Sequence, residues 1–539
     1  MKKPHRTLLA TCIALTLSIS VTTALAVAQP DTEEKKAPLT TESKVLIQLA
    51  GDGKSELLMN IIGPQTNLNV VNSAGNTPLH AAAEKGHNDI VKALLKHGAS
   101  YKIKNIKGQT AMLSAAEAGH ADTVELLLDA GAGLRTEDDE GANAMILAAY
   151  EGHLDVVKLL AAKGLELNST DDDGATALIN ALLGKKTDVA IYLINAGADL
   201  SIQDEYDNTA LLVAAQHNDT ETVKLLINKG VDISSTDSMN NQGLIYAIWK
   251  DNRELIDIFL DNGASIESQF VNNSRPLMVA ASLGNTKLVE YFIEKGADIE
   301  ARDNSKSTAL LYAARKNQSE TVNKLIKLGA EVDALDDFNR TPLIIAATLG
   351  NVESVQVLHE NKAAINHQDK SQKTALYWAT DKDRIDTIRY LLDNKADANL
   401  AESKGITPLM RTSMIGHIEV AEYLLTHGAD INAKSKGDVT ALIFASVSGK
   451  TKAVQLLLEH KAELEATDIN GRTALFYAGG RNFPRITKML VDAGIDINHI
   501  DAHGKTALDY ATQNNKADII NILKAGGGKP AAELTKEKF

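Results

Sequence analysis

The sequence predicts an all-α repeat solenoid, in which helix–turn–helix–hairpin units of 33 residues stack into a curved rod. Two observations indicate this fold class. A Thr-containing phrase returns every 33 residues from Thr77 to Thr506, which lie thirteen periods apart. Aromatic residues make up only 4% of the 539 residues, so the chain is not built around one large aromatic-rich core. A chain of this length would otherwise divide into several compact domains.

Four columns keep the register of the phrase over fourteen units. Its first position is Thr in eleven units, and Asn143, Gln242 or Arg275 in the other three. Leu follows two residues later in twelve units, Ala five residues later in thirteen, and Gly twenty-one residues later in eleven. No insertion or deletion interrupts the series, which is the signature of stacked structural repeats.

Each unit is expected to contain two short helices and a hairpin. In the first unit, residues 77–84 are rich in Ala and predict a closely packed helix. Residues 89–96 carry Ile90, Val91 and Leu94 on one face, as an amphipathic second helix does. Gly98 is expected to end that helix with a positive φ. One such unit cannot bury both apolar faces, so it must stack on its neighbours.

These features resemble the ankyrin repeat family. Thr77-Pro78-Leu79-His80-Ala81-Ala82 matches the family phrase, and Gly86-His87 and Gly98-Ala99 match its loop signals. The resemblance covers about residues 40–527 and implies a solenoid that binds partner proteins. One departure lies between Phe270 and Arg275, where the Thr and the usual turn Asp are both missing. We therefore expect a softer joint over residues 237–275.

The N-terminus has the pattern of a secretory signal peptide over residues 1–28. Lys2, Lys3 and Arg6 precede an apolar stretch at 8–25, which ends in Ala26-Val27-Ala28. An uncleaved membrane anchor is the alternative. Cleavage removes the single Cys of the chain, which suits an oxidising compartment. The mature protein is expected in a periplasm, or alternatively secreted, without stable membrane insertion.

The remaining segments follow from the register. Residues 29–38 form a polar linker, and residues 39–71 a divergent N-terminal capping repeat, because Leu46 and Gly53 lie 33 residues before Leu79 and Gly86. Residues 72–528 form fourteen ankyrin-type repeats, and residues 529–539 are expected to be a disordered tail. The mature protein is expected to be a monomer.

No motif for catalysis, metal or cofactor binding survives inspection. Gly53-Lys54-Ser55 lacks the first Gly of a phosphate loop, and Asp171-Asp172-Asp173-Gly174 lacks the closing Glu of a calcium loop, so each is interpreted as a turn. His87, His120, His153 and His417 share one repeat position and are interpreted as turn residues rather than as a metal ladder. The formal charge of −14 argues against a nucleic-acid partner.

Partner contacts are expected on the hairpin tips and on the exposed face of the first helix, where the resemblance places them. Large apolar residues at those places are candidates, with local packing as the alternative: Tyr150, Tyr206, Met239, Trp249, Phe338, Ile406, Met414 and Ile415. Acidic candidates lie on two early tips, at Asp139, Glu140, Asp172 and Asp173, whereas later tips are more basic. A second aromatic column is expected to face the neighbouring repeat as core: Tyr246, Tyr312, Trp378, Phe444, Tyr477 and Tyr510.

The sequence therefore favours an exported scaffold that binds one or more proteins and performs no catalysis. A periplasmic immunity or inhibitor protein and a secreted effector are alternatives within the same class. An enzyme or small-ligand receptor is less favoured, because the uninterrupted period offers no insertion that could build a pocket.

Overall fold

The computed structural model describes residues 41–536. The expected signal peptide, the linker and the last three residues of the tail lie outside the described residues. Between residues 41 and 536 the chain forms α-helices and one 3₁₀ turn without β-strands, and only two isolated β-bridges occur. The predicted all-α repeat solenoid is confirmed.

The first helix of each unit forms an inner layer. In the fourteen units that follow α1, the Thr position precedes the inner helix and has extended backbone angles, as helix N-caps do, and Pro begins several of these helices. The inner helices are α1 (Thr41–Gly51), α3 (Pro78–Glu84), α5 (Ala111–Glu117), α7 (Ala144–Glu151), α9 (Ala177–Leu183), α11 (Ala210–Gln216), α13 (Gly243–Trp249), α15 (Pro276–Leu283), α17 (Ala309–Arg315), α19 (Pro342–Leu349), α21 (Ala375–Asp381), α23 (Pro408–Ile415), α25 (Ala441–Val447), α27 (Ala474–Gly480) and α29 (Ala507–Gln513).

The second helix of each unit forms an outer layer. These helices pair along the array, as the inner helices do. The outer helices are α2 (Ser55–Ile61), α4 (Asn88–Lys96), α6 (Ala121–Asp129), α8 (Leu154–Ala162), α10 (Thr187–Asn195), α12 (Thr220–Asn228), α14 (Arg253–Asp261), α16 (Thr286–Glu294), α18 (Ser319–Lys327), α20 (Val352–Glu360), α22 (Ile385–Asp393), α24 (Ile418–Thr426), α26 (Thr451–Glu459), α28 (Pro484–Asp492) and α30 (Ala517–Ala525).

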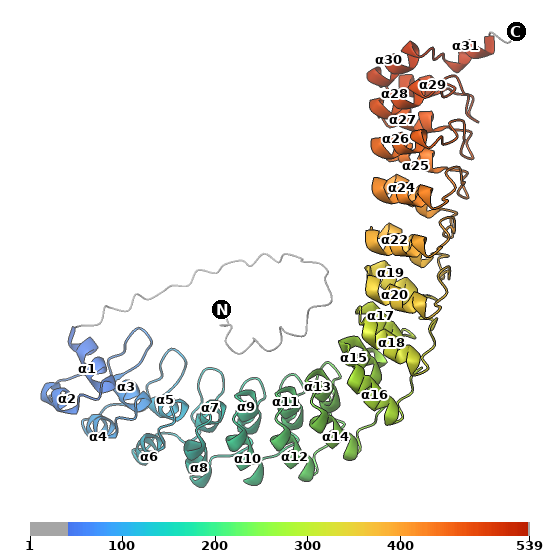
Figure 1. Cartoon of the computed structure of the whole chain (residues 1–539). Coiled ribbons are helices and arrows are strands. Elements are labelled where there is room, and N and C mark those ends of the chain that lie inside the picture. Colours follow the sequence, from blue (N-terminus) through green and yellow to red (C-terminus); the bar gives the residue numbers. More distant parts are fainter. Residues whose placement is uncertain (1–40, 537–539) are drawn as a thin grey trace.

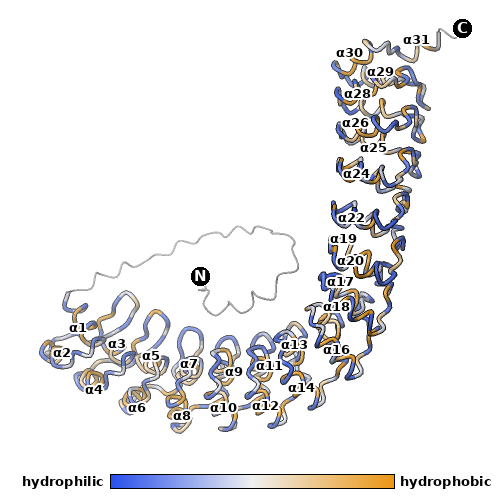
Figure 2. The backbone as a smooth tube through the Cα atoms, viewed as in Figure 1, coloured by the Kyte–Doolittle hydropathy of each residue, from blue (hydrophilic) through white to orange (hydrophobic). Residues whose placement is uncertain are grey.

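The core is one continuous strip between the two layers. It extends from Leu46 in α1 to Leu523 in α30, and the Leu and Ala columns provide most of it. Leu79, Ala82 and Leu94 are fully buried in the first full unit. Figure 2 shows the apolar residues concentrated in the helices and polar residues along the hairpin loops. Each unit buries its apolar faces only against its neighbours, which is the physical basis of a solenoid.

The loop that ends each outer helix has the predicted left-handed conformation. Gly98 has a φ of 89°. Three units place Lys at this position, and Lys362 still has a φ of 68°. A non-Gly residue in this region costs conformational energy, so the surrounding helix pair imposes the turn even where the favoured residue is missing.

The array consists of two arms that meet at a bend, rather than one evenly curved rod (Figure 1). We call residues 41–274 the first arm and residues 275–536 the second arm. In the view of Figure 1 the hairpins line the upper edge of the first arm and the right-hand edge of the second, where α22 to α30 lie on the left. The hairpins of the two arms therefore face different directions, and no single concave face spans the molecule.

The bend lies where the repeat sequence departs from its pattern. Phe270 takes the place of the turn Asp and is buried, and a 3₁₀ turn follows it (η2, Val271–Asn273). Neither Gln242 nor Arg275 caps the following helix with a side-chain hydrogen bond. Outer helices α14 and α16 contact each other less than any other consecutive outer pair. The expected softness of this joint stays a prediction.

The segment after residue 528 differs from expectation. Residues 531–536 form a short helix, α31 (Ala531–Lys536), where a disordered tail was expected. The backbone N–H of Lys529 donates to Oδ1 of Asn498 at 2.7 Å, and that of Ala531 donates to Oδ2 of Asp509 at 3.0 Å. These bonds hold the segment on the last unit. Disorder was expected from the composition of the segment, which does not show that Asn498 and Asp509 accept its backbone N–H groups.

Candidate protein-binding surface

In most of the hairpins, the carboxylate of the turn Asp determines the backbone conformation. In the hairpin that begins at Asp138, its Oδ1 accepts hydrogen bonds from the backbone N–H groups of Glu140 (3.0 Å) and Ala142 (2.9 Å). This is the geometry of an Asx turn, in which a short acidic side chain replaces a backbone acceptor. Asp171 and Asp204 repeat the pattern in the next two units. The tips are thus well-defined structures rather than loose loops.

The second oxygen of this carboxylate attaches the hairpin to its own inner helix. The hydroxyl of Tyr312 donates to Oδ2 of Asp303 at 2.8 Å, nine residues before it. Burial, together with the hydrogen bond to Asp303, raises the pKa of Tyr312 to about 12. Tyr246 makes the equivalent bond to Asp237 and is buried, whereas most of its column is half-buried. The polar members of this column, all except Phe444, therefore join hairpin to helix within a unit, and the column also packs against the core.

Backbone hydrogen bonds connect consecutive hairpins into a row. The N–H of Asp139 donates to the carbonyl of Lys107 at 3.1 Å, and the N–H of Asp172 donates to the carbonyl of Glu140 at 3.0 Å. The series continues along both arms to Ala502. Among the described hairpins it is interrupted once, between Met239 and Val271, at the bend. We call the residues carried by these linked hairpins the tip row.

The most exposed predicted residues lie on the tip row. Tyr206, Met239 and Phe338 occupy the same position in their units, and each exposes more than half of its surface. Tyr206 and Met239 lie on adjacent hairpins, which are joined by the Ser238 N–H donating to the Tyr206 carbonyl at 2.8 Å. Phe338 lies beyond the bend on the second arm. The structure therefore brings the first two together and separates the third from them.

The predicted residues on the inner helices are less exposed. Tyr150 on α7 and Trp249 on α13 are half-buried, and the Trp249 ring packs edge-on against Tyr246 with 5.3 Å between centroids. Met414 and Ile415 on α23 are also half-buried, as is Ile406 in the hairpin before that helix. Their partial burial supports local packing as much as partner contact, so they form a weaker part of the candidate surface.

Three exposed large apolar residues that share one position of the tip row were not among the predicted contacts: Ile106, Val271 and Ile469. Ile106 and Ile469 expose 63% and 68% of their surface, more than any other large apolar residue described. All three lie one position before the column of Tyr206, directly after the turn residue. Most units carry a polar residue at that position, so a large apolar side chain there was the available sequence signal.

Charge differs sharply between the arms. Residues 41–274 contain 33 Asp and Glu against 17 Lys and Arg, whereas residues 275–536 contain 33 against 33. The four acidic candidates, Asp139, Glu140, Asp172 and Asp173, are all exposed on consecutive tips of the first arm. On the second arm, the ammonium group of Lys373 lies 4.1 Å from the ring centroid of Trp378, close enough for a cation–π contact.

The recurring His residues have a structural role. Nε2 of His87, His120 and His153 lies 3.0 Å from the carbonyl oxygen of Gly51, Glu84 and Glu117, respectively, each at the end of the preceding inner helix. Polar donors at a helix C-terminus satisfy carbonyls that lack a partner. No group of three His, Cys, Asp or Glu able to hold a metal ion occurs within residues 41–536. The interpretation of these residues as turn residues is confirmed for the three.

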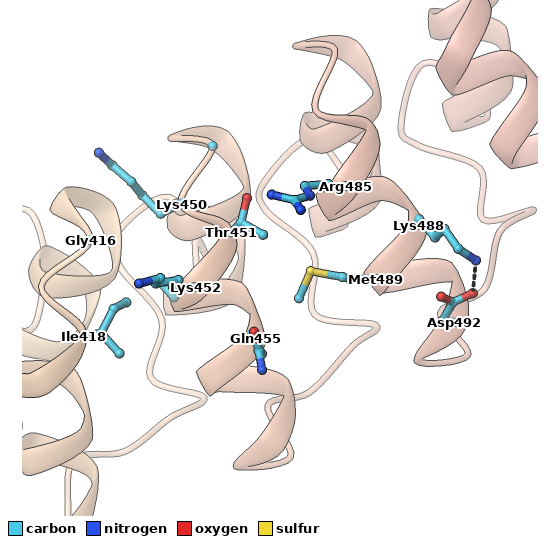
Figure 3. Close-up of a pocket in the computed structure, with 12 residues that line it drawn as sticks. Gly416, Ile418, Lys450, Thr451, Lys452, Gln455, Arg485, Lys488, Met489 and Asp492 are labelled. Atoms are coloured by element: carbon cyan, nitrogen blue, oxygen red, sulfur yellow. Dashed lines mark hydrogen bonds and ion pairs between the residues drawn. The ribbon is translucent and has the colours of Figure 1, made fainter.

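A basic groove lies between α26 and α28 (Figure 3). Lys450, Lys452, Arg485 and Lys488 line it, and Lys488 pairs with Asp492 at 3.0 Å. Figure 3 shows the four cationic groups pointing in different directions rather than toward a common point. A catalytic or small-ligand site needs convergent groups, and this groove does not provide them.

Comparison with known proteins identifies the repeats as members of a known family. A family model described as ankyrin repeats (3 copies) matches residues 46–138, 130–204, 197–270, 244–336, 317–402, 394–468 and 462–532. A search of curated proteins finds no match. In residues 41–536, none of the helices has the length and apolar character required to cross a bilayer. The matched segments overlap and span almost all of the helix pairs described above, so this chain belongs to the ankyrin repeat family.

Proposed function

We propose that this protein is an exported scaffold that binds one or more partner proteins through its tip row and performs no catalysis. The observation that carries the proposal is the exposure of Tyr206 and Met239 on adjacent, hydrogen-bonded hairpins. Large side chains held on an ordered backbone lose little conformational entropy on binding, and such residues often dominate interface energies.

The acidic first arm selects the chemistry of the partner. Asp172 and Asp173 precede the Tyr206 hairpin by one unit, so acidic and aromatic groups lie on one stretch of the tip row. We expect a partner that presents basic side chains beside an apolar patch. Opposite charges raise the rate of encounter and favour one orientation, and both effects weaken as salt screens them.

A capture experiment tests the surface. The mature protein, residues 29–539, is immobilised and exposed to envelope extract of the producing cells, and bound proteins are identified by mass spectrometry. The double variant Tyr206→Ala/Met239→Ala should reduce recovery of the captured partner at least tenfold. Leu328→Ala, an exposed residue at the end of α18 away from the tips, is the matched control and should not change recovery.

The outcome separates the proposal from its alternatives. Equal recovery by the double variant and the wild type would show that the tip row of the first arm is not the binding surface. Recovery that is insensitive to salt between low and physiological ionic strength would contradict the acidic steering. A lower melting temperature of the double variant would instead indicate that the two residues stabilise the fold.

Export is proposed from the pattern of residues 1–28, namely Lys2, Lys3 and Arg6, the apolar stretch and Ala26-Val27-Ala28. The intact mass of protein recovered from a periplasmic fraction should correspond to a chain that begins near Gln29 and contains no Cys. A full-length chain confined to the cytosolic fraction would contradict export.

A further inference from the structure

The first helix pair exposes residues that are buried in every other unit. Val45, Leu57 and Ile61 expose between 40% and 55% of their surface. The residues 33, 66 and further multiples of 33 positions later are buried in all fourteen following units. Ile61, for example, shares its column with Leu94 and Leu127, which are fully buried. A capping unit would carry polar residues in these columns.

The column of Leu57 contacts the preceding unit, and the columns of Val45 and Ile61 adjoin it, since Leu57 and Ile61 lie one helical turn apart on α2. In the column of Leu57, Thr123 Oγ1 donates to Oδ1 of Asn88 in the unit before it at 2.6 Å. In the columns of Val45 and Ile61, a Cβ added to Gly243 would overlap the ring of Phe259, so these two columns touch within a unit. By register, the three exposed side chains of α1 and α2 form one contiguous apolar patch.

The patch extends past the usual stacking face. Met59 is 40% exposed, in a column that is mostly charged or amide-bearing in later outer helices, such as Lys92 and Glu125. Met59 therefore extends the apolar area onto a neighbouring face of α2. We call Val45, Leu57, Met59 and Ile61 the N-terminal end patch.

The other end of the array is closed by polar residues. Thr512 in α29 is exposed in a column that is buried in the thirteen full units before it, and Lys524 in α30 takes a position that is aliphatic in twelve of those units. The backbone bonds of Lys529 and Ala531 then hold the following segment on this unit. Head-to-tail stacking of two chains would place the apolar patch on polar groups and is disfavoured.

We propose that the N-terminal end patch binds the same patch of a second copy of this chain, so that the mature protein is an end-to-end dimer rather than the expected monomer. The patch is the only uncovered stacking face of the described array, and a two-fold axis lets each copy cover the other. Charges around it alternate along the chain as Glu42, Lys44, Asp52, Lys54 and Glu56, which allows opposite charges to meet across such an axis. Residues 29–40 offer only one large apolar side chain, Leu39, to cover it instead.

Sedimentation velocity of the mature protein tests the dimer. Wild type should have the molar mass of two chains, and Leu57→Glu/Ile61→Glu should have the mass of one. Ile469→Glu, at the most exposed large apolar residue of the tip row, is the matched control and should remain a dimer. A wild type that is monomeric throughout the micromolar range would overturn the proposal.

A second measurement protects against a folding artefact in the double variant. The mature chain lacks Cys once residues 1–28 are removed, so Leu57→Cys introduces one thiol. Mild oxidation should produce disulfide-linked pairs, whereas Ile469→Cys should produce none above the background of random collision. If Leu57→Cys does not form disulfide-linked pairs, the occupant of the N-terminal end patch is not a second copy. The same conclusion follows if the protein is monomeric and deletion of residues 29–40 speeds hydrogen exchange of the α2 amides, because residues 29–40 then cover the patch. Capture of the partner by the tip row is independent of both outcomes.

Discussion

Nε1 of Trp378 donates a hydrogen bond of 2.8 Å to Oδ2 of Asp369, nine residues before it in the chain. Oδ1 of the same carboxylate accepts from the backbone N–H groups of Ser371 (2.8 Å) and Lys373 (3.0 Å). One side chain thus shapes a hairpin and attaches it to inner helix α21. This dual use of one carboxylate explains how a tip row can present side chains at defined positions without any β-sheet.

Removal of this carboxylate should loosen one hairpin. Asp369→Ala leaves Nε1 of Trp378 and two backbone N–H groups without their acceptor, at a cost of about 1–3 kcal/mol. Amide exchange at Ser371 and Lys373 should accelerate in proportion. Asp337→Ala, which removes only an ion pair with Lys306 at 3.1 Å, should change stability by less than about 0.5 kcal/mol. Equal effects of the two substitutions would contradict the dual role.

The His position should tolerate any side chain that donates to the preceding helix end. His120→Ala removes the contact of Nε2 with the Glu84 carbonyl and should cost about 1 kcal/mol. His120→Asn should restore most of it, because Asn351 at the same position donates to the Ala314 carbonyl at 2.9 Å. Denaturant unfolding followed by circular dichroism measures both. A chelator that lowers the melting temperature of the wild type would instead support a metal ladder.

The bend should exchange amide hydrogens faster than the rest of the tip row. The N–H of Val271 lacks the interhairpin acceptor that equivalent amides such as Asp139 and Lys370 have. We expect at least tenfold faster hydrogen exchange at Val271 than at those two positions, because an unpaired amide needs no opening step. Equal protection at the three amides would remove the idea of a softer joint.

Half-buried tyrosines with raised pKa values should make the protein sensitive to strong alkali. Burial and the Asp303 hydrogen bond raise the pKa of Tyr312 from 10.0 to about 12, and Tyr477 is raised to about 12 for the same reasons. A raised tyrosine pKa stabilises the fold below pH 10, and this contribution is lost as the pH rises from 10 through 12. Tyrosinate absorbance should rise in two phases, the later one together with loss of helix.

A Phe substitution isolates one contributor to this alkaline transition. Tyr312→Phe cannot ionise, so the variant should lose less stability than the wild type between pH 10 and 12. It should be less stable than the wild type at neutral pH, because it lacks the bond to Asp303. An unchanged alkaline slope would show that Tyr312 ionises normally.

Much of the candidate surface was predictable, and its errors have a common cause. Tyr206, Met239 and Phe338 were identified from the family resemblance and the repeat register, and their positions on hairpin tips leave each more than half exposed. Ile406 and Met414 proved half-buried, because their exposure depends on the length and direction of side chains in adjacent units. The bonds between aromatic residues and turn carboxylates were also unpredicted, because they join residues of different elements.

By itself, the sequence determined the 33-residue unit, the order of its helices and hairpin, and the residues that form its core. Periodicity controls these features, because each unit solves the same local packing problem. Only the tertiary structure decided the bend at Phe270, the linkage of the hairpins into a row and the exposure of the N-terminal end patch. Those features depend on small differences in how each unit meets the next. Such differences accumulate along a solenoid, because its continuous core is built only from contacts within a unit and between adjacent units.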